Sequence, residues 1–200
     1  MNKKVYSSSI KKTPFKYATS KKIAKLILDG CGRQEVFDKC YTENYIEIES
    51  SDRRKEITNV VYSRLIHIDE FLLKQFYESD VETSKFILVY AIAKSDELFF
   101  DFMFEIYREA LLGNKDYISI DDFDNFFAVK KETDLIVATW GYFTIDQLAK
   151  GYRNILVESG MGVRDRRSIK VTKLMVHPLV QDYIKQIGDS EYLKALLGEN

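Results

Sequence analysis

The chain has 200 residues, of which 46% are hydrophobic and 14% aromatic, so it can bury a core in one or two domains and is not a disordered protein. Its two cysteines have no CxxC spacing, which excludes a secreted disulfide framework and favours a reducing cytoplasm. The formal net charge is −1, and no segment approaches the roughly 18 consecutive apolar residues of a membrane helix, so the sequence predicts a cytoplasmic protein without membrane contact.

The charges are segregated along the chain. Residues 1–28 contain eight lysines and no acidic residue, and residues 150–173 contain seven basic residues against two acidic ones. Residues 29–149 hold 25 acidic and 13 basic residues, which cancels the two basic ends. Local positive charge of this kind can bind a polyanion, although a lysine-rich terminus can also be simply solvated.

The chain has only two prolines and nine glycines, so few helix-breaking residues interrupt the segments with helical periodicity. This composition favours a mostly α fold. The first helix is expected to be capped by Thr19 or Ser20 and to end at Gly30 and Gly32. A second helix is expected after the polar residues 49–52, with apolar side chains at helical spacing. These positions are Ile57, Val60, Val61, Leu65 and Ile68.

The middle of the chain, residues 86–113, is the most hydrophobic part and reads as two helices, the second capped by Ser95 and stopped by Gly113. Its aromatic face is assigned to the core rather than to a ligand site. A further helix is expected to start with a capping box formed by Ser119 and Asp122. The acidic side chains there are assigned to the helix start, because the pattern of a calcium-binding EF-hand is absent.

The last third predicts a helix, a turn, a second helix and a basic hairpin. Residues 134–140 form the short helix, residues 141–143 the turn, and Thr144 with Gln147 a capping box that opens the longer helix. One apolar face of that helix is expected to be buried, and its polar side chains are expected to lie outside that face. The buried set is Leu148, Tyr152, Ile155 and Leu156, and the free set is Gln147, Lys150, Arg153 and Asn154.

After Gly162, the apolar residues Ile169 and Val171 alternate with Lys170, which predicts a short strand. Pro178 suits the first turn of a last helix. A helix-turn-helix followed by a basic hairpin is the plan of a winged helix, in which the helix enters the major groove and the hairpin contacts the backbone or the minor groove. The same plan also occurs in domains that bind proteins. The expected fold is therefore mostly α, with helical bundle modules and a winged-helix-like C-terminal part.

Five segments in this order resemble the BrxA family of bacteriophage exclusion (BREX) systems. They are YSSSIKKTPFKYATSKKIAKLIL, VVYSRL, LVYAIAKSDELFFDFMFEIYREALLG, DYISIDDFDNFF and LAKGYRNILVESGMG. The resemblance implies a small, mostly helical accessory protein with winged-helix-like parts that binds double-stranded DNA. It also implies a gene beside the methyltransferase, ATPase and phosphatase-like members of a phage-defence locus, and hence other BREX proteins as partners.

Motifs of catalysis are missing from the sequence. It has no Walker A, GxSxG or HExxH motif, and the spacing of His67, His177, Cys31 and Cys40 matches no standard zinc or nucleophile site. We therefore expect no catalytic residue, no metal and no cofactor.

Two functions remain open: a DNA-binding accessory factor, and an assembly adaptor whose charged surfaces dock other defence proteins. The expected modules are residues 1–80, a basic helical module, and residues 81–200, an aromatic helical core followed by a winged-helix-like segment at about 132–188. The residues expected to contact DNA are Lys11, Lys12, Lys16, Lys21, Lys22, Lys150, Arg153, Arg164, Arg166, Arg167, Lys170 and Lys173.

Overall fold

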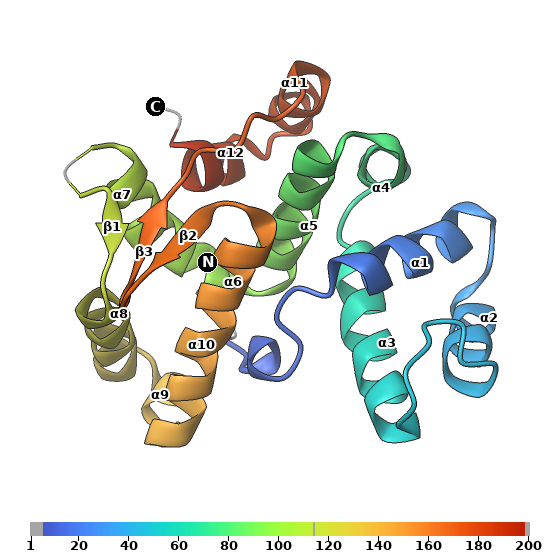
Figure 1. Ribbon diagram of the computed structural model, residues 1–200, viewed down its shortest axis with the longest axis horizontal. Helices are drawn as coiled ribbons and strands as arrows, with labels where there is room; N and C mark the ends of the chain where they lie inside the picture. Colours follow the sequence, from blue (N-terminus) through green and yellow to red (C-terminus); the bar gives the residue numbers. More distant parts are fainter. Residues whose placement is uncertain (1–5, 114, 199–200) are drawn as a thin grey trace.

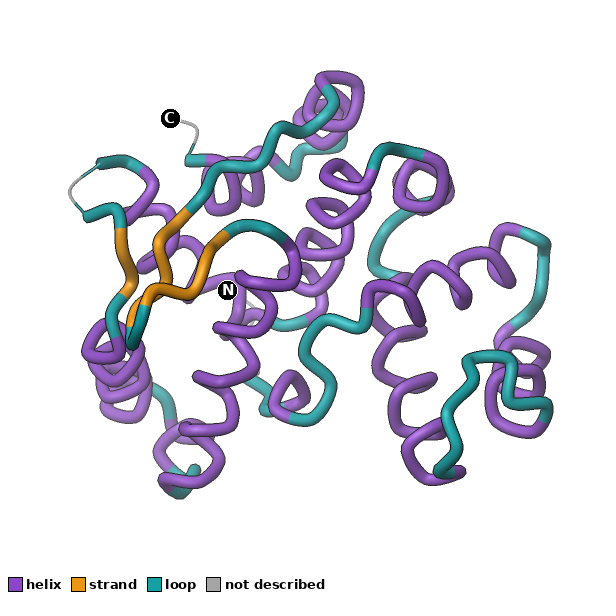
Figure 2. Tube along the Cα trace, viewed as in Figure 1, coloured by secondary structure: helices purple, strands orange, loops and turns teal. Residues whose placement is uncertain are grey.

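The computed structural model describes residues 6–113 and 115–198, and it confirms a mostly helical fold with a small sheet at one end (Figures 1 and 2). The elements in chain order are η1 (Ser9–Lys11), α1 (Tyr17–Leu28), α2 (Arg33–Phe37), η2 (Asp38–Thr42), α3 (Ser51–Leu65), α4 (Glu70–Glu78), α5 (Val81–Ser95), α6 (Glu97–Phe102), η3 (Met103–Tyr107), α7 (Arg108–Leu111), β1 (Tyr117–Ile118), α8 (Ile120–Thr133), α9 (Leu135–Ala138), α10 (Tyr142–Ser159), β2 (Gly162–Asp165), β3 (Ser168–Val171), α11 (Pro178–Gln186) and α12 (Ser190–Leu197). Within these described ranges, no helix has both the length and the apolar character needed to cross a bilayer.

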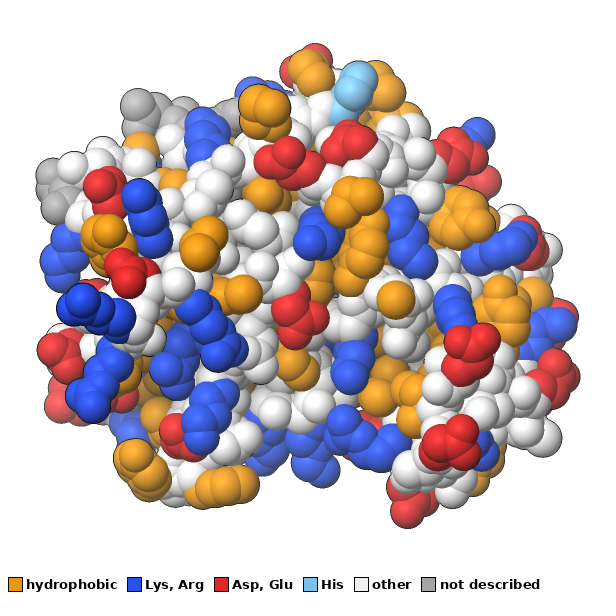
Figure 3. All heavy atoms as spheres, viewed as in Figure 1, with side chains coloured by type: hydrophobic (Ala, Val, Ile, Leu, Met, Phe, Trp, Pro, Cys, Tyr) orange, Lys and Arg blue, Asp and Glu red, His pale blue; other side chains and the backbone are white. Residues whose placement is uncertain are grey.

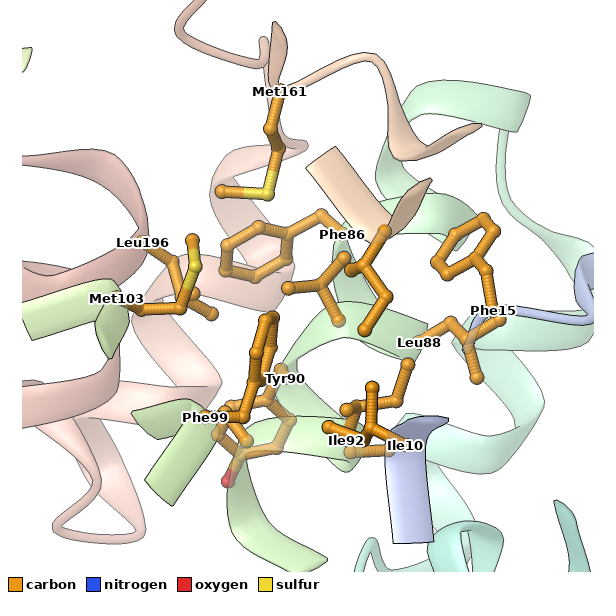
Figure 4. Close-up of a cluster of buried hydrophobic side chains, with 14 of the residues drawn as sticks. Ile10, Phe15, Phe86, Leu88, Tyr90, Ile92, Phe99, Met103, Met161 and Leu196 are labelled. Carbon is orange, nitrogen blue, oxygen red and sulfur yellow. The ribbon is translucent and has the colours of Figure 1, made fainter. Parts of the chain in front are cut away.

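Helix α5 is the centre of the core. All eight residues from Phe86 to Ala93 are at most 1% exposed, because helices from both halves of the chain, among them α3, α4, α6, α10 and α12, pack around it. Figure 4 shows its side chains beside Ile10, Phe15 and Leu196, which come from opposite ends of the sequence. The predicted division near residue 80 stays a prediction, and the buried side chains on its two sides belong to one cluster.

The segment before α1 is fixed to this core by a buried arginine. Arg64 is 2% exposed and donates to the carbonyl oxygens of Thr13, at 2.5 Å, and Pro14, at 3.0 Å. Burial lowers the pKa of Arg64 to about 10, partly offset by the charge of Asp96. Asp96 in turn accepts a hydrogen bond from Ser7 at 3.0 Å. These contacts tie the residues on both sides of η1 to α3 and to the start of α6.

The sheet has the strand order β1-β3-β2, and both pairings are antiparallel. Strands β2 and β3 form the predicted basic hairpin, with Arg166 and Arg167 as its two-residue turn. The close approach of the strands requires a glycine at 162, since a Cβ there would lie 2.3 Å from Ile169 Cγ2. Strand β1 was not predicted, because two residues are too short to show a strand period.

Three of the predicted helix caps are wrong. Helix α1 begins at Tyr17, with Lys16 as its N-cap, because the ring of Tyr17 packs between Phe15 and Phe76. Ser20 is therefore a buried residue inside the helix and not its cap. Helix α6 is capped by Asp96, which accepts from Phe99 N at 3.0 Å, whereas Ser95 donates back into α5.

The third wrong cap concerns α10, which starts at Tyr142 with Gly141 as its N-cap, so residues 141–143 are not a separate turn. The carbonyl of Gly141 already accepts from Thr144 N at 3.0 Å, and Gln147 donates to Asp146 instead of closing a capping box. The second predicted helix is α3, which ends at Leu65, before Ile68. The capping box of Ser119 and Asp122 is confirmed, as is Pro178 at the start of α11.

Candidate nucleic-acid interface

A positively charged groove lies between α10 and the basic hairpin (β2 and β3, residues 162–171). Its volume is about 380 Å³. Five cations line it together with three uncharged residues, and none of these described lining residues is acidic. The set, called the α10 groove below, is Lys150, Arg153, Asn154, Arg164, Arg166, Arg167, Ser168 and Ile169.

The periodicity of α10 places its polar side chains in the groove. Leu148, Tyr152, Ile155 and Leu156 are all 0% exposed, as the sequence predicted, so the opposite side of the helix faces outward. Lys150, Arg153 and Asn154 are three and four residues apart and therefore share that outward side. The packing of one stripe thus presents the three polar residues together.

The groove side chains are oriented by neighbours. Arg164 on β2 donates to Asn154 Oδ1 at 2.8 Å, which joins the hairpin to α10. The guanidinium of Arg153 lies 5.6 Å from the ring centre of Phe123, and its Nε donates to the carbonyl of Ala149 at 3.3 Å. Such contacts reduce the conformational freedom that these long side chains would lose on binding a ligand.

Lys150 is the one groove cation that an acid neutralises among the described contacts. Its Nζ lies 2.7 Å from Asp146 Oδ2, one helical turn earlier. The hydrogen bond from Lys150 is the main reason that the pKa of Asp146 is lowered. Asp146 therefore remains an anion beside the groove.

A second hollow continues the groove around the tip of the hairpin, where Arg166 and Arg167 are joined by Tyr117 from β1 and by Asp165. Arg166 has φ of +53°, a left-handed conformation that is strained for a residue with a side chain. The two arginines form the turn beyond Asp165 and Ser168, the last paired residues of the hairpin.

Two predicted C-terminal residues lie outside the α10 groove. Lys170 on β3 follows Ile169, which faces the groove, so by strand alternation Lys170 projects from the other face of the sheet. Lys173 is exposed beyond the end of β3. The structure therefore brings together five of the seven predicted cations of this region.

The predicted N-terminal lysines differ in their surroundings. Lys11 lies on η1, which packs on α10. Lys12 and Lys22 form ion pairs with Glu56 and Glu47, and Lys16 is the N-cap of α1. Lys21 donates to the carbonyls of Phe76 and Tyr77 and to Ser84, and burial lowers its pKa. The ammonium of Lys21 is therefore committed to internal contacts.

Figure 3 shows how these charges are distributed on one face of the molecule. Lysine and arginine side chains gather over the hairpin and α10 and continue along the lower edge of this face toward η1. A close approach explains the arrangement: a Cβ on Gly151 of α10 would lie 3.2 Å from the carbonyl oxygen of Ile10 in η1. The absence of a side chain at Gly151 lets the two basic segments meet.

The histidines make local hydrogen bonds within or at the ends of helices, and the cysteines are buried or partly buried. The Nδ1 of His67 lies 2.6 Å from the carbonyl of Ser63, and His177 caps α11 by accepting from Leu179 N. Cys40 is buried and Cys31 partly so. In the part of the chain that the structure describes, no group of three or more His, Cys, Asp or Glu side chains is arranged to hold a metal ion.

Comparisons with known proteins give a consistent relationship. A family model described as BrxA matches residues 4–188. The BREX protein BrxA of Bacillus cereus (strain H3081.97) is 32% identical over 199 residues, which covers 100% of both chains. The fold is similar to that in a crystal structure of an uncharacterized protein from Magnetospirillum magneticum, with a TM-score of 0.85 at 18% identity, covering 97% of this chain and 99% of that one.

Proposed function

Because the chain belongs to the BrxA family of bacteriophage exclusion (BREX) phage-defence systems, we propose that it is a non-enzymatic accessory protein that binds double-stranded DNA through the α10 groove. The observation that carries the proposal is the convergence of Lys150, Arg153 and the three hairpin arginines on one groove without an acidic lining residue. Regularly spaced phosphates are the ligands that such a row of cations fits best.

The proposed docking follows the winged-helix plan. Helix α10 lies in the major groove, which is wide enough for one helix, with Asn154 toward the base edges and Lys150 and Arg153 toward the phosphates. The hairpin acts as the wing, and Arg166 and Arg167 at its tip contact the backbone or enter the minor groove. Lys11 and Lys12 extend the contact to phosphates beyond the end of α10.

The second hypothesis is an assembly adaptor that binds other BREX proteins and has little affinity for DNA. The two hypotheses differ in salt dependence. Each phosphate contact changes the slope of log affinity against log salt by about 0.9, so the five groove cations alone contribute about −4 to −5 to the slope. Weak adsorption to DNA by an adaptor gives a much shallower slope.

The test is fluorescence anisotropy with a labelled duplex between about 50 and about 200 mM salt. The variant Arg164→Glu/Arg166→Glu/Arg167→Glu is expected to weaken binding strongly and to flatten the salt slope by about 3. A matched control replaces three lysines outside the proposed interface, Lys55, Lys74 and Lys85, by glutamate, which changes the net charge equally. Equal loss in both variants, or no binding by the native protein, would remove the proposal and favour the adaptor.

A further inference from the structure

The first turn of α10 exposes two adjacent aromatic side chains. Tyr142 is 87% exposed and Phe143 73%, whereas the next most exposed aromatic side chains among the described residues, Tyr41 and Tyr117, are 40% exposed. A protein does not gain stability from an aromatic ring left in water, so an exposed pair of this kind indicates a binding surface.

The pair lies on the same side of α10 as the cations of the groove. Tyr142, Asp146 and Lys150 are spaced by four residues, and Phe143, Gln147 and Lys150 by four and three, so both rows lead to Lys150. Phe143 and Lys150 are seven residues apart and therefore about 10 Å apart along the helix axis, which equals about three base-pair steps. A duplex seated on the groove therefore extends over both rings.

The surroundings leave the rings accessible to a large ligand. Gly141, the N-cap, has open space around it, since an added Cβ would have no atom within 4 Å. Leu135 on the preceding short helix is 79% exposed. Figure 3 shows hydrophobic side chains protruding over α9 and the start of α10, next to the cluster of basic side chains.

From this continuity with the cationic groove we infer that Tyr142 and Phe143 form a wedge that stacks on the bases of DNA at a partly unstacked step. The inference rests on the proposed DNA-binding function and specifies its ligand as duplex DNA with a distorted or unpaired step. Apolar side chains inserted between base steps, and aromatic rings stacked on bases, are known ways of binding distorted DNA. A mismatched step is favoured because its unstacking has already occurred.

The experiment compares two labelled duplexes of the same length, one fully paired and one with a central two-nucleotide bubble. The native protein is expected to bind the bubble duplex about tenfold more tightly, because stacking on one base contributes a factor of about five or more. In the variant Tyr142→Ala/Phe143→Ala the preference falls to about one, while the salt slope is unchanged because the phosphate contacts remain. The control is Tyr41→Ala/Tyr45→Ala, which removes two exposed aromatic rings elsewhere.

The outcomes separate the wedge from the groove. If the native protein binds both duplexes equally, or if the Tyr142/Phe143 variant keeps the preference, the wedge is refuted while DNA binding stands. If that variant instead loses self-association in light scattering with unchanged DNA affinity, the rings dock a second copy of the chain and the inference fails. If the native protein binds neither duplex, the proposed function fails as well. Thermal midpoints confirm that the variants fold.

Discussion

Asp146 is the residue that most directly opposes DNA in the proposed interface. Its carboxylate holds the ammonium of Lys150 at 2.7 Å and stays ionised because this hydrogen bond lowers its pKa. A phosphate approaching Lys150 therefore meets a negative charge one helical turn away. Repulsion of this kind limits affinity and can favour one DNA geometry over another.

Replacing Asp146 by asparagine removes that charge and frees Lys150. We expect D146N to bind duplex DNA about fivefold more tightly at low salt, with the gain shrinking as salt screens the site. Anisotropy titrations measure the change, and Asp182→Asn on α11 is the control for net charge. A gain of the same size in D182N would mean that total charge matters rather than the contact with Lys150.

The turn residues Arg166 and Arg167 have different backbone conformations, although both point into the proposed interface. The backbone of Arg166 has the left-handed conformation, with φ of +53°. This conformation costs a non-glycine residue about 1–2 kcal/mol. Replacement by glycine removes this strain, which outweighs the roughly 0.5–1 kcal/mol that glycine loses in chain entropy.

We therefore expect R166G to keep or raise the thermal midpoint and R167G, at a position where φ is not positive, to lower it. Both variants should weaken DNA binding and flatten the salt slope by about 0.9. Calorimetry and anisotropy on the same samples check the two parts. A fall in midpoint as large in R166G as in R167G would show that the turn is not strained at Arg166.

At the scale of elements, the contact between η1 and α10 depends on Gly151. In an open helix, alanine in place of glycine stabilises by about 1 kcal/mol. Here its Cβ would lie 2.9 Å from Ile10 Cγ2 and 3.2 Å from the Ile10 carbonyl oxygen. The backbone atom cannot rotate away, and overpacking of this kind costs about 1–3 kcal/mol.

We expect G151A to lower the free energy of unfolding by about 1 kcal/mol and to weaken DNA binding, because η1 carries Lys11 away from α10. Urea unfolding and anisotropy measure the two effects. Gly32→Ala is the control, since an added Cβ there has no atom within 4 Å. Unchanged DNA affinity in a destabilised G151A would exclude the N-terminal lysines from the interface.

The start of α8 offers a test by pH. Burial alone would raise the pKa of Asp122, but the hydrogen bonds from Ser119 and Lys115 outweigh it, and the pKa lies below its ordinary value of 3.8. The stabilisation is therefore present above that value and is lost as the pH falls through the lowered pKa.

Asp122→Ala is expected to lower the free energy of unfolding by about 1 kcal/mol at neutral pH. The difference from the native protein should disappear in acid, once Asp122 of the native protein is protonated. Urea midpoints over a pH series measure this, and Asp124→Ala on the exposed side of α8 should have little effect at any pH. A difference that persists in acid would point to lost packing instead of the capping box.

The sequence predicted the elements whose signal lies within one helix or hairpin. The stripe of Leu148, Tyr152, Ile155 and Leu156, the capping box at Ser119 and the pairing of β2 with β3 are all local patterns. The start of α1 at Tyr17 and strand β1 depend on contacts with residues far along the chain. Tyr142 and Phe143 were placed in a turn, because Thr144 offers a plausible cap and nothing local reveals that Gly141 takes that place.

At the scale of the whole molecule, DNA binding depends on the segregation of charge along the chain and on the single hydrophobic core. The basic ends and the acidic middle give a net charge of −1, so attraction to DNA has to come from the local groove. The two basic segments can act together only if the core holds them in fixed positions. Arg64, bonded to Thr13 and Pro14, and Gly151, in contact with η1, supply this connection.

Because the buried residues before and after residue 80 belong to one core, we expect the two halves of the chain to unfold together. The sole tryptophan, Trp140, reports on the region of α9 and α10. In a Cys31→Ser variant, Cys40 reports on the N-terminal half: it is 0% exposed, and burial raises the pKa of its thiol to about 11. Cys40 therefore reacts with a thiol reagent only after unfolding.

We expect tryptophan fluorescence and Cys40 reactivity to change at the same urea concentration, with one midpoint and one slope. Coincidence follows because α5, which starts at residue 81, packs against α3 and α4 from before that boundary and against α10 and α12 from after it, so neither half keeps its core without the other. Reaction of Cys40 at a lower urea concentration would instead establish an independent module ending near residue 80. The N-terminal lysines would then move separately from the α10 groove, and a continuous DNA footprint would require DNA itself to order the two parts.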